Sequence, residues 1–489
     1  MAGLEQCPAN IVEEIVAYLD LTDAGNLRQT NRYLRSRVTQ GRFRFNFRSK
    51  RVKLTGADLQ QLGLLTQRGW LGCETRHLTL VGVVNDTMAL EAGHKADATD
   101  PRKRDLEILR QRRQDYEQLL ESGNIVQLLS QAFKYLATNS AERKLQSLSL
   151  EVTVYRQDAE REITPLAGGS WSLIWQTTAE TFGIVLAALQ KSLLAVDYLN
   201  VFDGYYMQRC SLESRELSQI DYRNEGLSKV LRALKALSIS VSDRILWLTP
   251  QGAQRSGDSA DVIDWSDDEH DRDIDKVTAE AQDENNFVGL ARMLDVCHEL
   301  KSLQIHQYLV NSRHLTFHIP SPRERLFQRV AESAALPALE DCFLRGVFIR
   351  ERDLLALLKR TQLRRLSLES VQMVSGTFRS IFDACTGETS SLSYLYLDEL
   401  MIQGDLVHFT GAGEPMFNTW VGAHGSNTLK REGEELKHPI LYHPPPMECQ
   451  YLWDLLRDNS GCLSNGRNTD PTDRSISWHY SALSYILQE

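Results

Sequence analysis

The 489-residue sequence lacks the features of secreted and membrane-spanning proteins. Its eight cysteines are scattered and form no Cys-x-x-Cys pair. The N-terminus has no basic segment followed by an apolar one, and no run of about eighteen apolar residues occurs anywhere. We therefore expect a reduced intracellular location, cytoplasmic or nuclear, without structural disulfides and without a membrane span.

Catalytic motifs are also missing. The sequence has no G-x-x-x-x-G-K-[ST], no G-x-S-x-G and no H-E-x-x-H. His314 and His318 stand four residues apart, but the intervening Leu-Thr-Phe is typical of a strand or turn, and no further ligand completes a metal set. The prediction is a protein that is not an enzyme and that binds no metal or cofactor.

An excess of positive charge is missing as well. The net charge is −10, so the chain as a whole is repelled by nucleic acid and by anionic lipid, and neither is an expected partner. A local basic stretch ends in Arg48, Lys50, Arg51 and Lys53. A solvated surface is the favoured explanation for this stretch, and contact with an acidic partner is the alternative.

What the sequence does contain is enough apolar material for a large core, at 42% hydrophobic and 25% charged residues. Near the N-terminus, apolar residues at 11, 12, 15, 16 and 19 recur at helical spacing after Pro8. Thr22 can cap a short second helix, and Thr30 can cap a third over 31–38. This predicts three short helices, which cannot bury much surface alone.

From there to about residue 400, helical stretches alternate with short runs of the pattern L-x-x-L-x-L. The runs are Leu145/Leu148/Leu150, Val196/Leu199/Val201, Leu234/Leu237/Ile239, Leu300/Leu303/Ile305, Leu363/Leu366/Leu368 and Leu392/Leu395/Leu397, with partial copies at Leu78/Leu80 and Leu336/Leu339. Helices are expected over 124–137, 178–190, 286–299, 322–335, 350–360 and 377–384. Helix alternating with strand predicts parallel strands with helices outside them. Repetition at this spacing is typical of leucine-rich repeats.

Two segments interrupt the pattern. Residues 91–117 are dense in both charges, and residues 251–285 are rich in aspartate. Both compositions predict solvated loops, the second largely without stable structure. Residues 401–489 mix Gly, Pro and aromatic residues without a clear period, which predicts an irregular cap with short helices near 451–457 and 481–487.

The N-terminal segment resembles the F-box, a family motif of about forty residues. The matching positions are Pro8, Ile11, Ile15, Leu19, Asp23, Leu27, Arg28 and Leu34, with Tyr33 where the family usually has Trp. Cys7 and Ala24 depart from the usual leucines. The resemblance implies that this module binds a Skp-type adaptor, and through it a cullin ligase. Pro8, Ile11, Ile15, Leu19 and Leu27 are the expected adaptor contacts.

The predicted architecture is therefore α/β: a three-helix F-box (5–53), an irregular leucine-rich-repeat-like solenoid with parallel strands and outer helices (54–400), and a C-terminal cap (401–489). The implied function is recognition of a protein target for ubiquitin transfer, which partner subunits perform. The alternatives are a protein-binding scaffold outside any ligase, in which the N-terminal helices only cap the repeats, and a hydrolase or transferase in the tail.

The expected target surface is the face of the strands opposite the leucines. Aromatic residues there cover a large area at low entropic cost. The predicted target contacts are Tyr198, Phe202, His306, Tyr394 and Tyr396. For Phe202 and Tyr394, packing beneath a neighbouring insertion is an equally open alternative.

Overall fold

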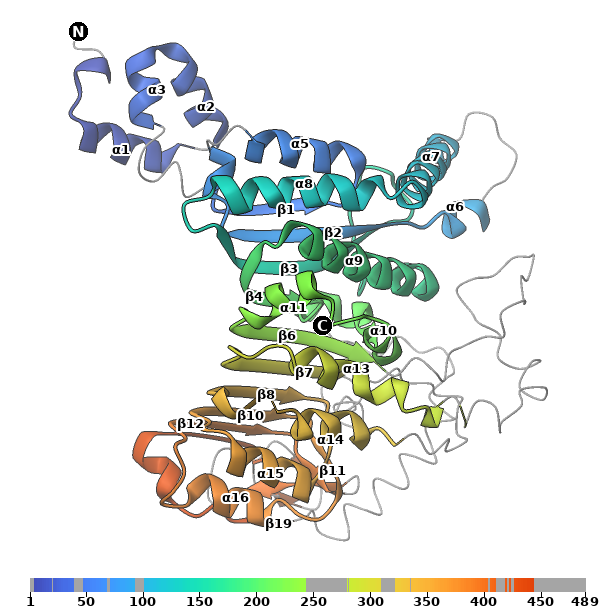
Figure 1. Ribbon diagram of the computed structural model, residues 1–489, viewed down its shortest axis with the longest axis vertical. Coiled ribbons are helices and arrows are strands. Elements are labelled where there is room, and N and C mark those ends of the chain that lie inside the picture. Colours follow the sequence, from blue (N-terminus) through green and yellow to red (C-terminus); the bar gives the residue numbers. More distant parts are fainter. Residues whose placement is uncertain are drawn as a thin grey trace. The chain divides into compact units, whose positions relative to one another are not determined.

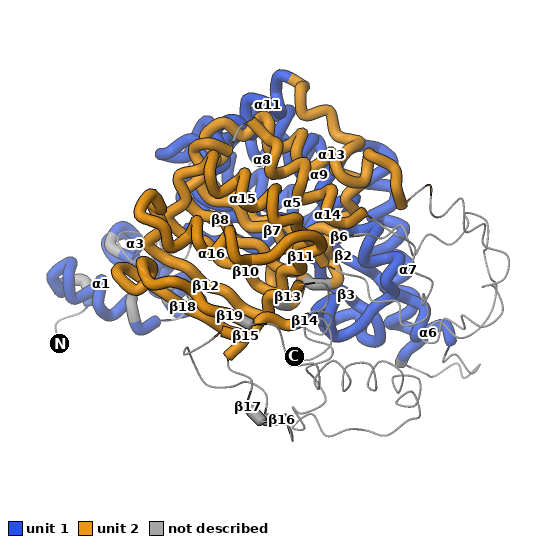
Figure 2. Tube along the Cα trace, turned by 90° about the horizontal axis from the view of Figure 1, so that it is seen from below, with its two compact units in different colours: residues 1–201, 225–233 blue, residues 202–224, 234–489 orange. Residues whose placement is uncertain are grey.

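The computed structural model describes residues 4–19, 21–38, 47–67, 71–92, 101–242, 279, 281–308, 322–334, 336–402, 405–409, 418–419, 422–423 and 426–443. The chain forms two compact units (Figure 2). Unit 1 contains residues 1–201 and 225–233, and unit 2 contains residues 202–224 and 234–489. Three predictions lie outside the described residues: the structure of most of the aspartate-rich segment, the role of His314 and His318, and the two helices after residue 450.

The N-terminal region of unit 1 contains the three predicted helices (Figure 1). After a short 3-10 turn, η1 (Leu4–Gln6), come α1 (Ala9–Tyr18), α2 (Leu21–Thr30) and α3 (Arg32–Val38). The predicted caps are wrong. Thr22 lies within α2, and the Thr30 hydroxyl donates to the Leu27 carbonyl. The Asn31 side chain caps α3 instead, accepting a hydrogen bond from the Leu34 N–H at 2.8 Å.

Unit 1 continues with parallel strands whose leucines lie in register. The strands are β1 (Ser49–Lys53), β2 (His77–Asn85), β3 (Lys144–Tyr155) and β4 (Ala195–Val201). Leu78, Leu148 and Leu199 are neighbours across three strands, and all are buried. The helices α5 (Gly56–Gln67), α8 (Asn124–Asn139) and α9 (Trp171–Ser192) lie side by side over these strands (Figure 1).

The charged segment 91–117 is not the loop that its composition predicts. Pro101–Glu121 forms a long helix, α7, after a short helix α6 (Met88–Ala92). Leu106 and Leu109 of α7 are buried in a cluster with Val83 and Tyr155. Two apolar residues three apart are enough to fix one face of a helix, while its other faces carry the charges.

Helix α9 is the one described helix that is long and apolar enough to cross a membrane by length and composition. Its apolar residues have a local explanation, because Ile174, Phe182, Val185 and Leu189 are buried within the structure. The helix packs against α8, β2 and β3 of the same unit.

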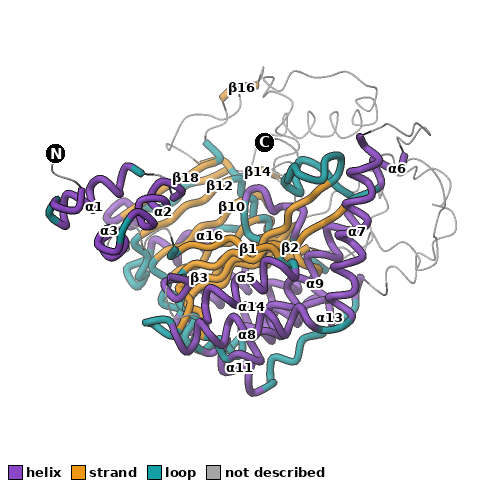
Figure 3. Tube along the Cα trace, turned by 90° about the horizontal axis from the view of Figure 1, so that it is seen from above, coloured by secondary structure: helices purple, strands orange, loops and turns teal. Residues whose placement is uncertain are grey.

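Unit 2 contains a second series of parallel strands. They are β6 (Ala236–Ser242), β7 (Ser302–Tyr308), β8 (Asp341–Arg345), β10 (Arg365–Glu369) and β12 (Tyr394–Asp398). Leu303, Cys342, Leu366 and Leu395 are neighbours across four strands and are buried. The helices α13 (Asn285–Leu294), α14 (Glu324–Glu332), α15 (Glu351–Arg360) and α16 (Arg379–Thr386) pack successively against one another and form a helical layer. In Figure 3, α13 and α14 lie to one side of the strands β10 and β12.

The strands β8, β10 and β12 each end in the same turn. The residue that follows is Gly346, Ser370 or Glu399, with φ of 66°, 50° and 48°. Each turn leads into a short strand, β9 (Phe348–Arg350), β11 (Gln372–Ser375) or β13 (Met401–Ile402), and these pair in parallel with one another. The left-handed backbone at equivalent positions indicates that a structural unit is repeated.

The remaining elements are short. They are η2 (Leu71–Glu74), η3 (Tyr205–Cys210), β5 (Leu212–Glu213), α10 (Ser214–Ser218), α11 (Glu225–Arg232), η5 (Leu336–Ala338), β14 (Asp405–Leu406), β15 (His408–Phe409), β16 (Asn418–Thr419), β17 (Gly422–Ala423), β18 (Thr428–Glu432), η6 (Gly433–Lys437) and β19 (Tyr442–His443). Strand β18 pairs antiparallel with β12, so the part of the tail that the structure describes is more regular than predicted.

The mixed α/β class, the parallel strands and the six helices expected between residues 124 and 384 are thus confirmed, although α13 ends earlier than expected. The repeat copy predicted at Leu336/Leu339 is wrong in register, because Leu336 lies in η5 and β8 places Cys342 and Leu344 beside Leu366 and Leu368. The solenoid and the F-box assignments stay predictions.

Candidate functional site

The three N-terminal helices form a small module around its own core. Val12 and Val16 of α1 and Leu34 and Val38 of α3 are buried together. Cys7, Leu19 and Leu27 pack against this cluster while staying partly exposed. Two of the predicted adaptor contacts, Leu19 and Leu27, therefore also hold the module together.

A second apolar stripe of α1 lies beside the buried one. Ile11 is 41% exposed and Tyr18 is 91% exposed, while Ile15 between them is half-buried. The spacing i, i+4, i+7 places these three side chains on one face of the helix. Pro8 is exposed at the start of this face, and Tyr33 of α3 is also exposed. Tyr18 is absent from the predicted contacts, although its spacing from Ile11 and Ile15 was visible in the sequence.

The second candidate surface is the face of the unit 2 strands that lies opposite the buried leucines. Strand pairing places Phe343, Ser367 and Tyr396 in one row, and Asp341, Arg365 and Tyr394 in the next. Tyr394 and Tyr396 are half-buried neighbours on this face of β12. The Tyr396 hydroxyl lies 3.4 Å from an Asp398 oxygen. The structure therefore brings these two predicted target contacts together.

His306 is not an outward contact, contrary to the prediction. It is 9% exposed and belongs to a buried polar network. One Arg345 nitrogen donates both to His306 Nδ1 at 3.1 Å and to Asp203 Oδ1 at 3.0 Å. Because arginine only donates, Nδ1 must accept, so the ring is neutral with its proton on Nε2. Burial, followed by the charge of Arg345, lowers the pKa of His306 well below its ordinary value.

The segment that follows β4 explains this burial. Asp203 accepts a hydrogen bond from Ser238 Oγ. The hydroxyl oxygens of Ser211 and Ser240 are hydrogen-bonded to each other at 2.6 Å. Ser240 Oγ in turn lies 3.1 Å from His306 Nδ1. Residues 203–213 therefore fold back against β6, β7 and β8. Ser240 is fully buried, and His306 Nδ1 already accepts a hydrogen bond from Arg345. Ser240 and His306 therefore cannot act as a nucleophile and its general base.

Phe202 is also wrong as an outward contact, since only 1% of it is exposed. Strand β4 ends at Val201, and Phe202 adopts a left-handed conformation with φ of 55°. Side chains alternate between the two faces of a strand only as far as Val201, so the pattern does not turn Phe202 outward. The following Asp203-Gly204 pair is a turn signal that could have indicated this.

The corresponding strand face of unit 1 carries Tyr198, which is half-buried on β4. Here the segment after β3 folds back, as Val154 and Ile163 exchange backbone hydrogen bonds of 3.1 and 2.9 Å. Glu162 of this segment forms ion pairs with Lys53 and with Arg51. Burial alone would raise the pKa of Glu162, but hydrogen bonds from Lys53 and Tyr155 and the two positive charges lower it to about 2. Arg51 and Lys53 of the basic stretch are therefore paired within the chain.

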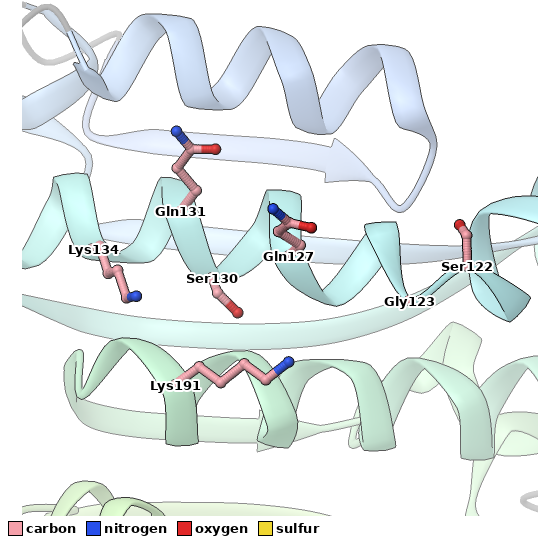
Figure 4. A pocket seen from close by; sticks show the side chains of 7 residues that line it. All are labelled: Ser122, Gly123, Gln127, Ser130, Gln131, Lys134 and Lys191. Atoms are coloured by element: carbon pink, nitrogen blue, oxygen red, sulfur yellow. The ribbon is translucent and has the colours of Figure 1, made fainter.

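A shallow groove of about 700 Å³ lies along α8 and α9 (Figure 4). Its lining is polar and includes Gln127, Lys134 and Lys191. The lining contains no carboxylate, histidine or cysteine, so the groove offers neither a general base nor a nucleophile of that kind. Within the described ranges, no group of three His, Cys, Asp or Glu side chains could hold a metal ion.

Comparison with known proteins gives no further assignment. The sequence matches no protein-family model, and no curated protein matches it. The functional argument therefore depends on the two surfaces: the apolar stripe of α1 and the aromatic strand face of unit 2.

Proposed function

We propose that this chain is a substrate-recognition adaptor of a Skp, cullin and F-box type ubiquitin ligase. The observation that carries the proposal is the stripe of Ile11, Ile15 and Tyr18 on α1. The core of the module buries the neighbouring Val12 and Val16 and leaves this stripe at the surface. Apolar side chains grouped on one face of a small module favour a protein partner.

The strand repeats support the second half of the proposal, a leucine-rich-repeat-like body. The strands β8, β10 and β12 begin at residues 341, 365 and 394, so the units are 24 and 29 residues long. Leucine-rich repeats are 20–29 residues long and have a strand followed by a helix or 3-10 segment in each unit. The units here have this length and order, with the short strands β9 and β11 in addition. A row of strands with exposed side chains on one face is a suitable surface for holding a target.

The alternative is a scaffold of the same fold that joins no ligase. In that case the N-terminal helices would have no partner of the Skp type. Capture of the adaptor discriminates between the two functions, because both predict a target on the strand face.

The test is co-purification of the full-length chain with a Skp-type adaptor. Ile15→Asp should lower capture about thirty-fold or more, since losing a central anchor commonly costs about 2 kcal/mol. Ile11→Asp should act in the same direction. Glu14→Gln, an exposed change on the same helix, is the matched control and should leave capture unchanged.

Circular dichroism of each variant checks that α1 stays folded. Undiminished capture by a folded Ile15→Asp chain, or no capture by the parent chain, would contradict the ligase role and favour the scaffold.

A further inference from the structure

The strand face of unit 2 contains an arginine that aromatic rings hold in place. The guanidinium carbon of Arg365 lies 5.7 Å from the centre of the Phe343 ring and 5.2 Å from that of Tyr394. These rings come from the strands on either side, β8 and β12. Contact with aromatic rings restrains a guanidinium while leaving its in-plane N–H groups available.

Those N–H groups have no acceptor in the described part of the chain. Arg365 is exposed, and its side-chain nitrogens form no ion pair or hydrogen bond with the described residues, although Asp341 of β8 lies near enough to interact with its charge. The other cations of this face differ. Arg345 is paired with Asp203 at 3.0 Å, and Lys430 is paired with Glu432 at 2.9 Å.

We infer that Arg365 is the anchor for an acidic side chain of the target, bound through two parallel N–H···O hydrogen bonds. The inference rests on the proposed function and names the chemistry of its target. Arginine and carboxylate are planar groups with matching geometry. Phe343, Tyr394 and Tyr396 beside it provide apolar surface for a residue next to the acid.

The charge of the site favours a carboxylate over a phosphorylated residue. The guanidinium carries a single positive charge, part of which the Asp341 carboxylate beside it already offsets. A phosphate group carries nearly two negative charges at neutral pH and is therefore balanced less well than a carboxylate. Asp341 lies in register with Arg365 on β8 and would repel an incoming anion. Its repulsion is larger for the phosphate.

The test measures binding of the full-length chain to an array of degenerate heptapeptides whose central residue is Glu, Gln, Lys or phosphoserine, followed by Phe or Ser. The parent chain should retain the Glu-Phe peptides about tenfold better than the Gln-Phe peptides, because a hydrogen-bonded charge is worth roughly 1.5 kcal/mol or more. Arg365→Gln should abolish this preference. Asp341→Asn should increase it by removing the repulsion.

Arg379→Gln is the matched control, because it removes the same charge from an exposed position on α16 of the helical layer. It should leave the preference unchanged. Absence of a Glu preference in the parent chain, its survival in Arg365→Gln, or stronger retention of phosphoserine than of Glu would overturn the inference. Capture of the Skp-type adaptor, measured on the same proteins, reports separately on the ligase role.

Discussion

A neutral histidine inside a protein is a source of acid sensitivity, and His306 is in this position. Its ring accepts a hydrogen bond from Arg345 and can become charged only by losing that bond beside a positive group. In the unfolded chain the same ring is free to take a proton near pH 6.5. The unfolded state therefore binds the proton more readily than the folded state does.

The sign of the effect follows from this difference. The contribution of His306 to the free energy of unfolding should be fully present above pH 6.5. It should fall as the pH drops below 6.5, by up to about 1.4 kcal/mol per pH unit. His306→Asn retains an acceptor and removes the titration, so its free energy of unfolding should depend less steeply on pH between 7 and 5. Urea unfolding at several pH values measures both slopes.

The exposed His298 supplies the control. His298→Asn also removes a histidine but leaves the buried network of His306 intact. Equal slopes in the parent chain and in His306→Asn would mean that the folded state accommodates a charged His306.

At the scale of elements, close packing of two helices explains why position 289 is a glycine, which no periodicity of the sequence indicates. Gly289 of α13 faces the C-terminal part of α10. A Cβ atom there would lie 2.4 Å from the Ser218 nitrogen and 2.6 Å from the Leu217 carbonyl carbon. Both of these are backbone atoms, which cannot rotate away as a side chain can.

Gly289→Ala should therefore destabilise the chain by about 1–3 kcal/mol, the usual cost of overpacking. Gly183→Ala is the matched control within α9, since nothing lies within 4 Å of its added Cβ. That change should stabilise the helix by roughly 0.5–1 kcal/mol. Urea unfolding of the two variants should thus give shifts of opposite sign, and a neutral Gly289→Ala would show that α10 and α13 can separate.

The helix α7 shows why composition misleads at this scale. Its charges suggested a solvated loop, and most of its surface is indeed charged. Only Leu106 and Leu109 are buried, yet they dock the helix against Val83 and Tyr155. A local sequence can show that such a helix is possible, but the surface that receives the two leucines comes from distant strands.

At the scale of the whole molecule, the aspartate-rich segment 251–285 does not end where its composition suggests. Ala281 is fully buried, and Glu284 pairs with Arg329 of α14. The last residues of the segment thus belong to unit 2. Residues 251–278 lie outside the described residues, and their composition still predicts that folding does not require them.

Two deletions test separately whether residues 251–278 and the last residues of the segment contribute to stability. Removing 251–278 should leave the melting temperature nearly unchanged. Removing 251–285 should lower it by several degrees, because the longer deletion takes away the buried Ala281 and the Glu284 ion pairs. Calorimetry of the two proteins compares them, and a large decrease with the shorter deletion would show that Val262, Ile263 or Trp265 packs on the body.

The sequence by itself determined most of the elements of this protein, with α7 and the strands of the tail as exceptions. Leucines at L-x-x-L-x-L spacing predicted parallel strands, and apolar residues at helical spacing predicted the helices between them. Both predictions succeed because the two periods are local properties of the chain. The exposed stripe of α1 is also visible in the spacing of Ile11, Ile15 and Tyr18.

Only the tertiary structure decided which outward positions remain accessible. Arg345 and Asp203 are 142 residues apart, and their contact is part of the network that buries His306. Glu162 neutralises Arg51 from 111 residues away. Such contacts depend on how distant segments fold back onto the strands, and periodicity within one segment contains no information about them. The same long-range pairing placed Arg365 between Phe343 and Tyr394.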